Sequence, residues 1–195
     1  QLLEAGVDVN QRMKPQRRAS GGPGDGMSPL ILAVENGHFE LAGQLLQAGA
    51  DPNDRGPGYT PLHAITWVRK PIRGDGDPPP HGSGQISSLQ LVRILVASGA
   101  DVNAAHGKHR PNRSALNRTD ATPFLLAAET ADVPLMRLLL ELGADPSLTN
   151  ADHVTPLLAA AGIGVLGDGD ESAGTEEEAI EAVQLLLELG ADVNA

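Results

Sequence analysis

Apolar residues recur at intervals of three and four along several stretches of the chain, which is the spacing of one face of an α-helix. The first stretch contains Leu41, Leu45 and Leu46 and stops at Gly49. A later stretch stops at Gly143 and contains Leu135, Leu138, Leu139 and Leu142. A glycine is typical of a helix C-terminus because it adopts the left-handed conformation that satisfies the last carbonyls. The pattern therefore predicts amphipathic helices that end at glycines.

A second mark lies ahead of these helices. Serine or threonine, then proline, then leucine or phenylalanine, begins at Ser28, Thr60, Thr122 and Thr155. The hydroxyl can accept a free backbone N–H at a helix start, and proline fits the first helical position, where a missing N–H costs nothing. Each unit should thus hold two helices, one that starts at the proline and one that ends at the glycine. The sequence predicts an all-α fold.

The end of the unit is repeated along the chain. The segment Gly-Ala-Asp-(Val/Pro)-(Asn/Ser) occurs at Gly49, Gly99, Gly143 and Gly190, with a variant at Gly6. Together with the start marks it resembles the ankyrin-repeat family, whose unit is a turn plus two antiparallel helices of about 33 residues. The segments at 60–63, 99–103 and 36–40 are closest to the family's signatures. The resemblance implies an ankyrin-repeat solenoid of stacked helix-turn-helix units with projecting hairpin or loop fingers.

The spacing of the marks predicts one ankyrin-repeat domain over residues 1–195. Residues 1–10 are expected to end a preceding repeat. Four repeats follow at 27–53, 59–103, 121–148 and 154–195, with insertions at 69–85 in the second and 163–175 in the fourth. Gly-Asp-Gly-Asp occurs at 74–77 and again at 167–170, which indicates duplication of a two-unit block. Neither end has the polar outer face of a capping repeat, so we expect a segment of a longer array.

Composition narrows the function classes. Apolar residues make up 41% of the 195 residues and aromatic residues only 2%, which suits thin layers of Leu, Val, Ile and Ala. The formal net charge of -11 argues against general binding to nucleic acid or anionic membranes. The absence of cysteine excludes disulfides, thiolate zinc sites and a cysteine nucleophile. No cofactor is indicated, and the sequence defines neither a localisation nor an oligomeric state.

The resemblance implies that a partner contacts the residue before each start mark and the residues seven and eight positions after it. In the second unit these are Tyr59, Trp67 and Val68, which include two of the chain's four aromatic residues. Tyrosine and tryptophan are enriched in binding hot spots. The alternative is that Trp67 packs on Pro71 or Ile72 of the insertion beside it. Neighbouring candidates, with ordinary solvated surface as the alternative, are Met27, Arg55, Glu35, Glu129 and Thr130.

Two long connections, residues 11–26 and 104–118, carry basic residues on the side where the family's fingers project. These residues are Arg12, Lys14, Arg17 and Arg18 in the first finger, and Lys108, Arg110, Arg113 and Arg118 in the second. We expect Lys108, Arg110 and Arg113 to face an acidic patch of the partner. Neither finger holds an aromatic residue that could stack on a base, so nucleic acid is not the predicted partner. The alternative is two flexible, solvated loops.

Acidic residues in the insertions suggest comparison with calcium-binding loops. Asp75 and Asp77 alternate with glycine, as do Asp168 and Asp170, and calcium loops use oxygen ligands at alternate positions. The later bidentate glutamate is missing at its required spacing, and Gly-Asp also forms tight turns. The sequence therefore predicts no metal ligand, and calcium-responsive binding is kept as an alternative function.

His63 is the best-placed histidine, and the resemblance implies a structural role in which it braces adjoining turns by hydrogen bonds. The sequence pattern supplies no serine or paired carboxylate for it, and no Gly-x-x-x-x-Gly-Lys phosphate loop. We therefore predict no enzymatic activity. The predicted function is binding of another protein, and not of nucleic acid or membrane, through the finger tips and the concave face of the first helices. A structural spacer without its own partner is the alternative.

Overall fold

The computed structural model describes residues 7–14, 26–70, 84–108, 116–162 and 174–194. Within these ranges it contains eight helices and no strand. The helices form four pairs: α1 (Pro29–Glu35) with α2 (Phe39–Gln47), α3 (Pro61–Arg69) with α4 (Ser88–Ala97), α5 (Pro123–Glu129) with α6 (Val133–Glu141), and α7 (Pro156–Ala160) with α8 (Glu176–Glu188). The predicted all-α fold of stacked helix pairs is confirmed.

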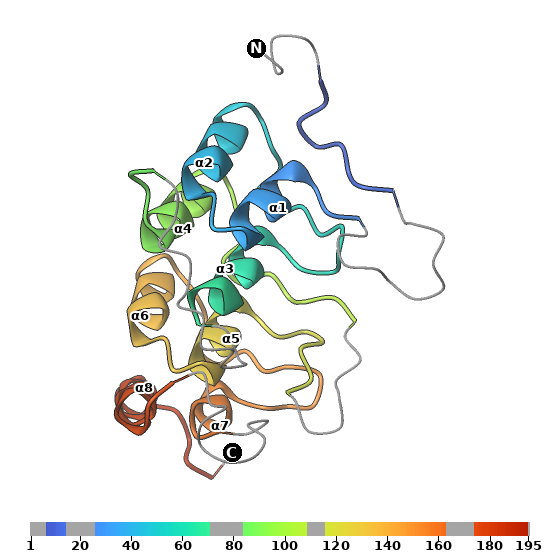
Figure 1. Ribbon diagram of the computed structural model, residues 1–195. Coiled ribbons are helices and arrows are strands. Elements are labelled where there is room, and N and C mark those ends of the chain that lie inside the picture. Colours follow the sequence, from blue (N-terminus) through green and yellow to red (C-terminus); the bar gives the residue numbers. More distant parts are fainter. Residues whose placement is uncertain (1–6, 15–25, 71–83, 109–115, 163–173, 195) are drawn as a thin grey trace.

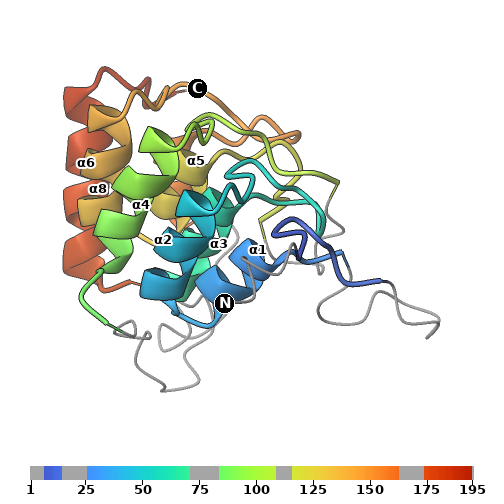
Figure 2. The same cartoon turned by 90° about the horizontal axis from the view of Figure 1, so that it is seen from above.

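The pairs stack in chain order, from α1 and α2 at one end of the molecule to α7 and α8 at the other (Figure 1). The first helices form one layer, because α1 packs against α3, α3 against α5, and α5 against α7. The second helices form the other layer (Figure 2). The connections between pairs project away from the layer of first helices, which gives the molecule an inner side, facing these loops, and an outer side.

The four start marks begin helices as predicted. Ser28, Thr60, Thr122 and Thr155 are N-caps in extended conformation, and a proline follows each of them as the first helical residue. Thr122 Oγ1 accepts the backbone N–H of Leu125 at 3.2 Å, and Ser28 and Thr155 cap in the same manner. Thr60 differs, since its backbone N–H and its hydroxyl are both bonded to the Nδ1 atom of His63.

The glycines end the second helix of each unit as predicted. Gly49, Gly99, Gly143 and Gly190 have φ values between 88° and 98°, a region that favours glycine. After α2, the N–H of Gly49 bonds to the carbonyl of Leu46 and the N–H of Ala50 bonds to that of Leu45. The other three helix ends repeat this pair of bonds, which is the Schellman motif.

The described ends of the two long connections are paired by backbone hydrogen bonds. In the first, Met13 N donates to the carbonyl of Met27 at 2.9 Å, and Gly26 N donates to that of Met13 at 3.2 Å. In the second, His106 N donates to the carbonyl of Ala121, and Asp120 N to that of His106. The structure therefore shows the paired bases from which the two predicted fingers begin.

Arg69, which the sequence places at the start of an insertion, is instead the last residue of α3. Its Nε and Nη2 atoms donate to the two carboxylate oxygens of Asp132 at 2.7 and 2.9 Å, and its Nη1 atom donates to Ser88 Oγ at 2.5 Å. Asp132 is fully buried and also caps α6 by accepting Leu135 N. The guanidinium thus joins α3, α4 and α6. It reaches Ser88 and Asp132 from the last turn of α3, so Arg69 belongs to the helix and not to the insertion.

Asparagine side chains join successive units along the loop that follows each second helix. Asn10 accepts the N–H of Asp51 and donates to the carbonyl of Gly49. Asn53 bonds to Asp101 and Gly99 in the same way, and Asn103 bonds to Asp145 and Gly143. Each of these asparagines therefore fixes the next unit at a constant offset through two backbone hydrogen bonds.

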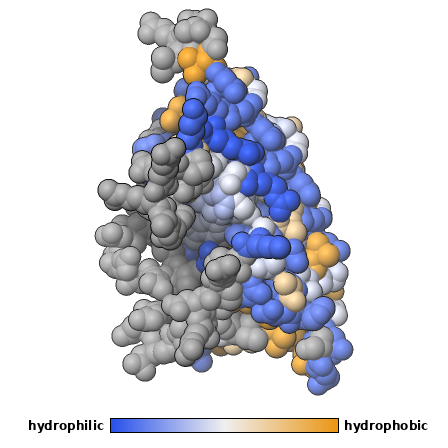
Figure 3. Space-filling view, turned by 90° about the vertical axis from the view of Figure 1, so that its right-hand side faces the viewer, coloured by the Kyte–Doolittle hydropathy of each residue, from blue (hydrophilic) through white to orange (hydrophobic). Residues whose placement is uncertain are grey.

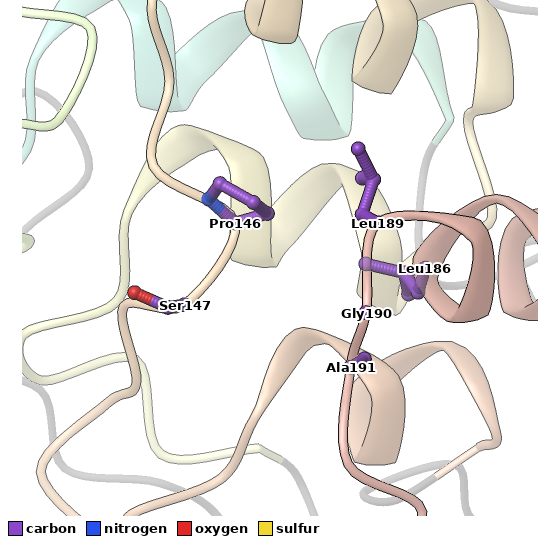
Figure 4. Close-up of a pocket in the computed structure, with 6 residues that line it drawn as sticks. All are labelled: Pro146, Ser147, Leu186, Leu189, Gly190 and Ala191. Atoms are coloured by element: carbon purple, nitrogen blue, oxygen red, sulfur yellow. The ribbon is translucent and has the colours of Figure 1, made fainter.

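The series changes at Ser147, which occupies the position of the asparagine in the third unit. Among the described residues its hydrogen bonds go only to Asp145, two residues earlier. A small pocket of about 100 Å³ opens here between Pro146 and Ser147 on one side and Leu186, Leu189, Gly190 and Ala191 on the other (Figure 4). The shorter serine side chain leaves the last unit without the polar link that joins the others.

We expect Ser147→Asn to restore that link. The new amide should donate to the carbonyl of Gly190 and accept the N–H of Asp192, as its counterparts do in the earlier units. Two hydrogen bonds at the rim of a partly exposed site should add about 1 kcal/mol to the free energy of unfolding. Urea denaturation measures the gain, with Ser147→Ala as the control that adds no amide. Equal stability of the two variants would show that the link does not form.

Candidate functional site

Three residues occupy equivalent positions on the inner side of successive units. Glu35, Trp67 and Glu129 are each the seventh residue after an N-cap, at Ser28, Thr60 and Thr122. Because α1, α3 and α5 pack side by side, these residues follow one another along one face of the stack. We call Glu35, Trp67 and Glu129, together with Tyr59 and Arg118 that contact or face them, the inner-face row.

Tyr59 and Trp67 pack together within this row. Their rings meet edge to face with centroids 4.9 Å apart, a favoured arrangement of aromatic pairs. The Tyr59 hydroxyl donates to Glu35 Oε1 at 2.5 Å, which fixes the tyrosine against the first unit. Burial raises the pKa of Tyr59 well above its usual value, and the bond to Glu35 adds to the rise. Both rings pack against the core yet remain partly exposed, as expected of residues that can anchor a partner.

Two buried histidines, His63 and His106, lie next to the aromatic pair. His106 lies 5.8 Å from the Tyr59 ring and 5.4 Å from the His63 ring, centroid to centroid. His63 is fully buried, and its Nε2 atom donates to the carbonyl of Ala121 at 3.0 Å while Nδ1 accepts from Thr60. Burial lowers the pKa of His63 to about 3, so the ring is neutral. Its bonds span two units, which matches the bracing role that the family resemblance implies.

Arg118 also contacts Trp67, with its guanidinium carbon over the ring, 5.3 Å from the centroid. A cation over an indole face is attracted by the ring quadrupole. The charge of Arg118 also acts on Glu129, at the end of α5, where burial raises the carboxyl pKa to about 6 against the lowering effect of Arg118. Glu129 Oε2 is buried and has no hydrogen-bond partner among the described residues.

The raised pKa of Glu129 has a defined effect on stability. A carboxyl group whose pKa is higher in the folded chain than in the unfolded chain favours folding when it is protonated. This contribution is complete below about pH 4.5, the ordinary value, and is lost as the pH rises through about 6. At neutral pH the ionised Glu129 therefore lowers the free energy of unfolding.

Two of the predicted contact residues are too deeply buried to reach a partner in this conformation. Val68 is 6% exposed and belongs to the hydrophobic core, because it is apolar and lies on the covered side of α3. Thr130 is 2% exposed, and its hydroxyl faces the carbonyls of Leu126 and Ala127 in its own helix. Met27 is half-buried at the base of the first finger. The structure brings Tyr59 into contact with Trp67 and Glu35. Glu129 lies on the neighbouring helix α5.

Some basic residues in or beside the fingers form an ion pair or a hydrogen bond within the chain. Arg12 forms an ion pair with the buried Asp54, and the Arg55 guanidinium donates to the carbonyl of Ala105. Lys108 is exposed, whereas Arg110 and Arg113 lie outside the described residues. The side toward which the fingers project is mainly hydrophilic over the described residues, with small separate hydrophobic patches (Figure 3). Arg12, a predicted finger residue, and Arg55, a predicted contact residue, thus form bonds within the chain.

The sequence did not indicate that Arg118 contacts Trp67 or that His106 contacts Tyr59. Arg118 was assigned only to a basic finger, and the signal that could have singled it out is its place four residues before the cap Thr122. Nothing local indicates that it folds back onto Trp67, a residue of the preceding unit. The proposed packing of Trp67 on Pro71 or Ile72 falls outside the described residues.

The calcium candidates Asp75, Asp77, Asp168 and Asp170 also lie outside the described residues. Over the part of the chain that the structure describes, no three His, Cys, Asp or Glu side chains are grouped so that they could hold a metal ion. In the same part, none of the helices has the length and apolar character needed to cross a membrane.

Comparison with known proteins agrees with the geometry. The ankyrin-repeat family profile matches residues 25–57 and 119–151, the segments of the first and third units. The chain is 35% identical over 158 residues to the nuclear factor NF-kappa-B p105 subunit of Gallus gallus, covering 70% of this chain and 15% of that protein. It is 31% identical over 175 residues to human ankyrin repeat and SOCS box protein 6, covering 88% of this chain and 33% of that protein.

The chain belongs to the ankyrin-repeat family. Ankyrin repeats are generally protein–protein interaction modules, and the family is generally non-enzymatic. A further relative, the B-cell lymphoma 3 protein homolog of Mus musculus, is 31% identical over 139 residues, covering 70% of this chain and 24% of that protein. The chain spans a third or less of the length of these relatives.

Proposed function

We propose that this chain binds another protein through its inner side, with the inner-face row at the centre of the contact. The observation that carries the proposal is the edge-to-face pair of Tyr59 and Trp67, which remains partly exposed. Two of the chain's four aromatic residues meet at this partly exposed position, and tyrosine and tryptophan are enriched in binding hot spots. The pair also occupies the positions that face partners in the family it resembles.

The surroundings of the pair support this proposal. Tyr59 is held by Glu35 and packs edge to face against Trp67, so both rings are oriented before a partner arrives. Preorganised side chains lose little conformational entropy on binding, which increases affinity. The finger bases stand beside the row, because His106 contacts Tyr59 and Arg118 contacts Trp67. A partner that reaches the aromatic pair would therefore also touch the fingers, where Lys108 could meet an acidic patch.

The test is the effect of Trp67→Ala on the affinity for a partner isolated with the immobilised chain. Loss of an aromatic anchor should weaken binding by about 2 kcal/mol, or about 30-fold in Kd. The helical circular dichroism should stay unchanged. Leu41→Ala is the matched control, because Leu41 is an apolar side chain 45% exposed on α2, away from the row.

The alternatives give different results. If Trp67→Ala lowers the melting temperature by several degrees without changing the affinity, Trp67 is a core residue and the proposal is wrong. If the wild-type chain retains no protein above a variant with a scrambled inner surface, the chain is a structural spacer.

A further inference from the structure

The inner-face row contains an unused hydrogen-bond acceptor beside an aromatic surface. Glu129 Oε2 is buried without a partner, and neither a hydrogen bond nor an ion pair joins Glu129 to Arg118 among the described residues. A buried acceptor without a donor is costly, more so when it is ionised. Because burial raises the pKa of Glu129 only to about 6, the carboxyl group is mostly ionised at neutral pH. The site is therefore incomplete in the free chain.

Arg118 shows which chemistry fits beside Trp67. Its guanidinium stands over the indole ring at 5.3 Å, on the same inner side as Glu129. It satisfies the attraction of the ring for a cation but does not donate to the buried carboxylate oxygen. A guanidinium has five N–H donors in a planar fork, so one such group can stack on an aromatic ring and bond to a carboxylate at once. Arg118 performs the first of these two tasks only.

We propose that the protein partner inserts an arginine side chain between Trp67 and Glu129, where it displaces Arg118 and donates to the buried carboxylate. This inference rests on the proposed function, and it specifies the chemistry of the partner at the same face. In the free chain, Arg118 occupies the aromatic half of the arginine site. In the complex, the partner's guanidinium occupies both halves, and Arg118 turns toward solvent.

The charges of the row favour a cationic side chain over an anionic one. The helices on either side of α3, which carries Trp67, each hold a carboxylate, Glu35 on α1 and Glu129 on α5, and the charge of Arg118 acts on Glu129. A carboxylate of the partner would be repelled by Glu35 and Glu129. The chain as a whole also carries a formal charge of -11. Arginine is favoured over lysine because only the guanidinium can stack and form a fork of bonds.

The experiment uses the fluorescence of Trp67, which is the single tryptophan of the chain. The probes are the acetylated and amidated peptide Gly-Gly-Arg-Gly-Gly and the same peptide with citrulline, which has the shape of arginine without its charge. We expect the arginine peptide to change the fluorescence in a saturable way with a Kd on the order of 1 mM. The citrulline peptide should bind at least 10-fold more weakly.

Two variants separate the proposal from its rivals. Glu129→Gln should weaken the arginine peptide at least 10-fold while the melting temperature at pH 7 stays equal or rises, so the loss is not unfolding. Arg118→Ala should strengthen it several-fold, since a competitor is removed. Glu141→Gln, which changes an exposed carboxylate paired with Arg93 on the outer helices, is the control and should have no effect.

The proposal is overturned if the wild-type chain shows no saturable change, if citrulline binds as well as arginine, or if Arg118→Ala weakens the peptide. The last result would mean that Arg118 itself recognises an acidic group. The proposed function fails separately. A protein partner that is lost with Trp67→Ala but unaffected by Glu129→Gln leaves the function standing and removes the arginine site, whereas a partner indifferent to Trp67→Ala removes the function.

Discussion

Replacing Arg69 by alanine is expected to lower the free energy of unfolding by about 3 kcal/mol, the lower end of the cost of breaking a buried ion pair. The Arg69 side chain is 17% exposed and that of Asp132 only 1%, so the carboxylate would remain buried without its cation. Among the described residues, its one remaining hydrogen bond would be the cap of α6, which the backbone N–H of Leu135 donates. Three helices from two units would lose their common link, and urea denaturation with a helical readout measures the effect.

The matched control for Arg69→Ala is Arg93→Ala. Arg93 also bonds to a carboxylate in the next unit, Glu141, but both side chains are more than half exposed. Solvent screening weakens such an exposed pair, so Arg93→Ala should change the free energy of unfolding far less than Arg69→Ala does. The combined variant Arg69→Met with Asp132→Asn keeps the α6 cap and removes both charges, so it should recover most of the loss. Equal effects of Arg69→Ala and Arg93→Ala would contradict the buried pair.

His63 should make the chain unstable in acid. Its pKa is about 3 when folded and 6.5 in the unfolded chain, so below about pH 6.5 the unfolded chain binds a proton that the folded chain excludes. Stability should therefore fall as the pH is lowered from about 6.5 toward 3, by about 1.4 kcal/mol for each pH unit. At pH 4.5 this loss amounts to roughly 3 kcal/mol.

His63→Gln tests the source of that slope. Glutamine can still donate to the carbonyl of Ala121 but does not titrate, so the variant should lose about 1 to 2 kcal/mol at pH 7 and then follow a flatter pH profile. Glu129 changes the pH profile in the opposite direction, but it is present in both proteins. Its contribution therefore cancels when the free energies of unfolding of the wild type and the variant are subtracted. Urea denaturation at pH 7 and pH 4.5 gives the result. Parallel profiles would assign the acid sensitivity to other groups.

Local signals predicted the helix framework because local chemistry determines it. The proline after Ser28 and the glycine at 49 act on their own helix ends, and the structure shows the cap and the Schellman motif that these residues favour. Glu35, Trp67 and Glu129 were assigned to one face from the family resemblance, and their equal distance from the N-caps places them on the same side of successive helices.

Contacts between units could not be predicted in the same way. Arg69 meets Asp132, and Arg118 meets Trp67, across separations of many residues, and no residue type near either position signals its partner. Val68 was assigned to the exposed face from its family position, although a valine at the side of α3 gains more by joining the core. Such contacts depend on how the pairs stack, which individual motifs do not specify.

The most direct test of the central claim, that a partner binds the inner side, is hydrogen–deuterium exchange of the chain with and without that partner. We predict slower exchange at residues 59–68 and 116–121, which carry Tyr59, Trp67 and Arg118, and unchanged exchange in α2 and α4 on the outer side. Slower exchange confined to α2, α4 and α6, with no change at residues 59–68, would contradict the account.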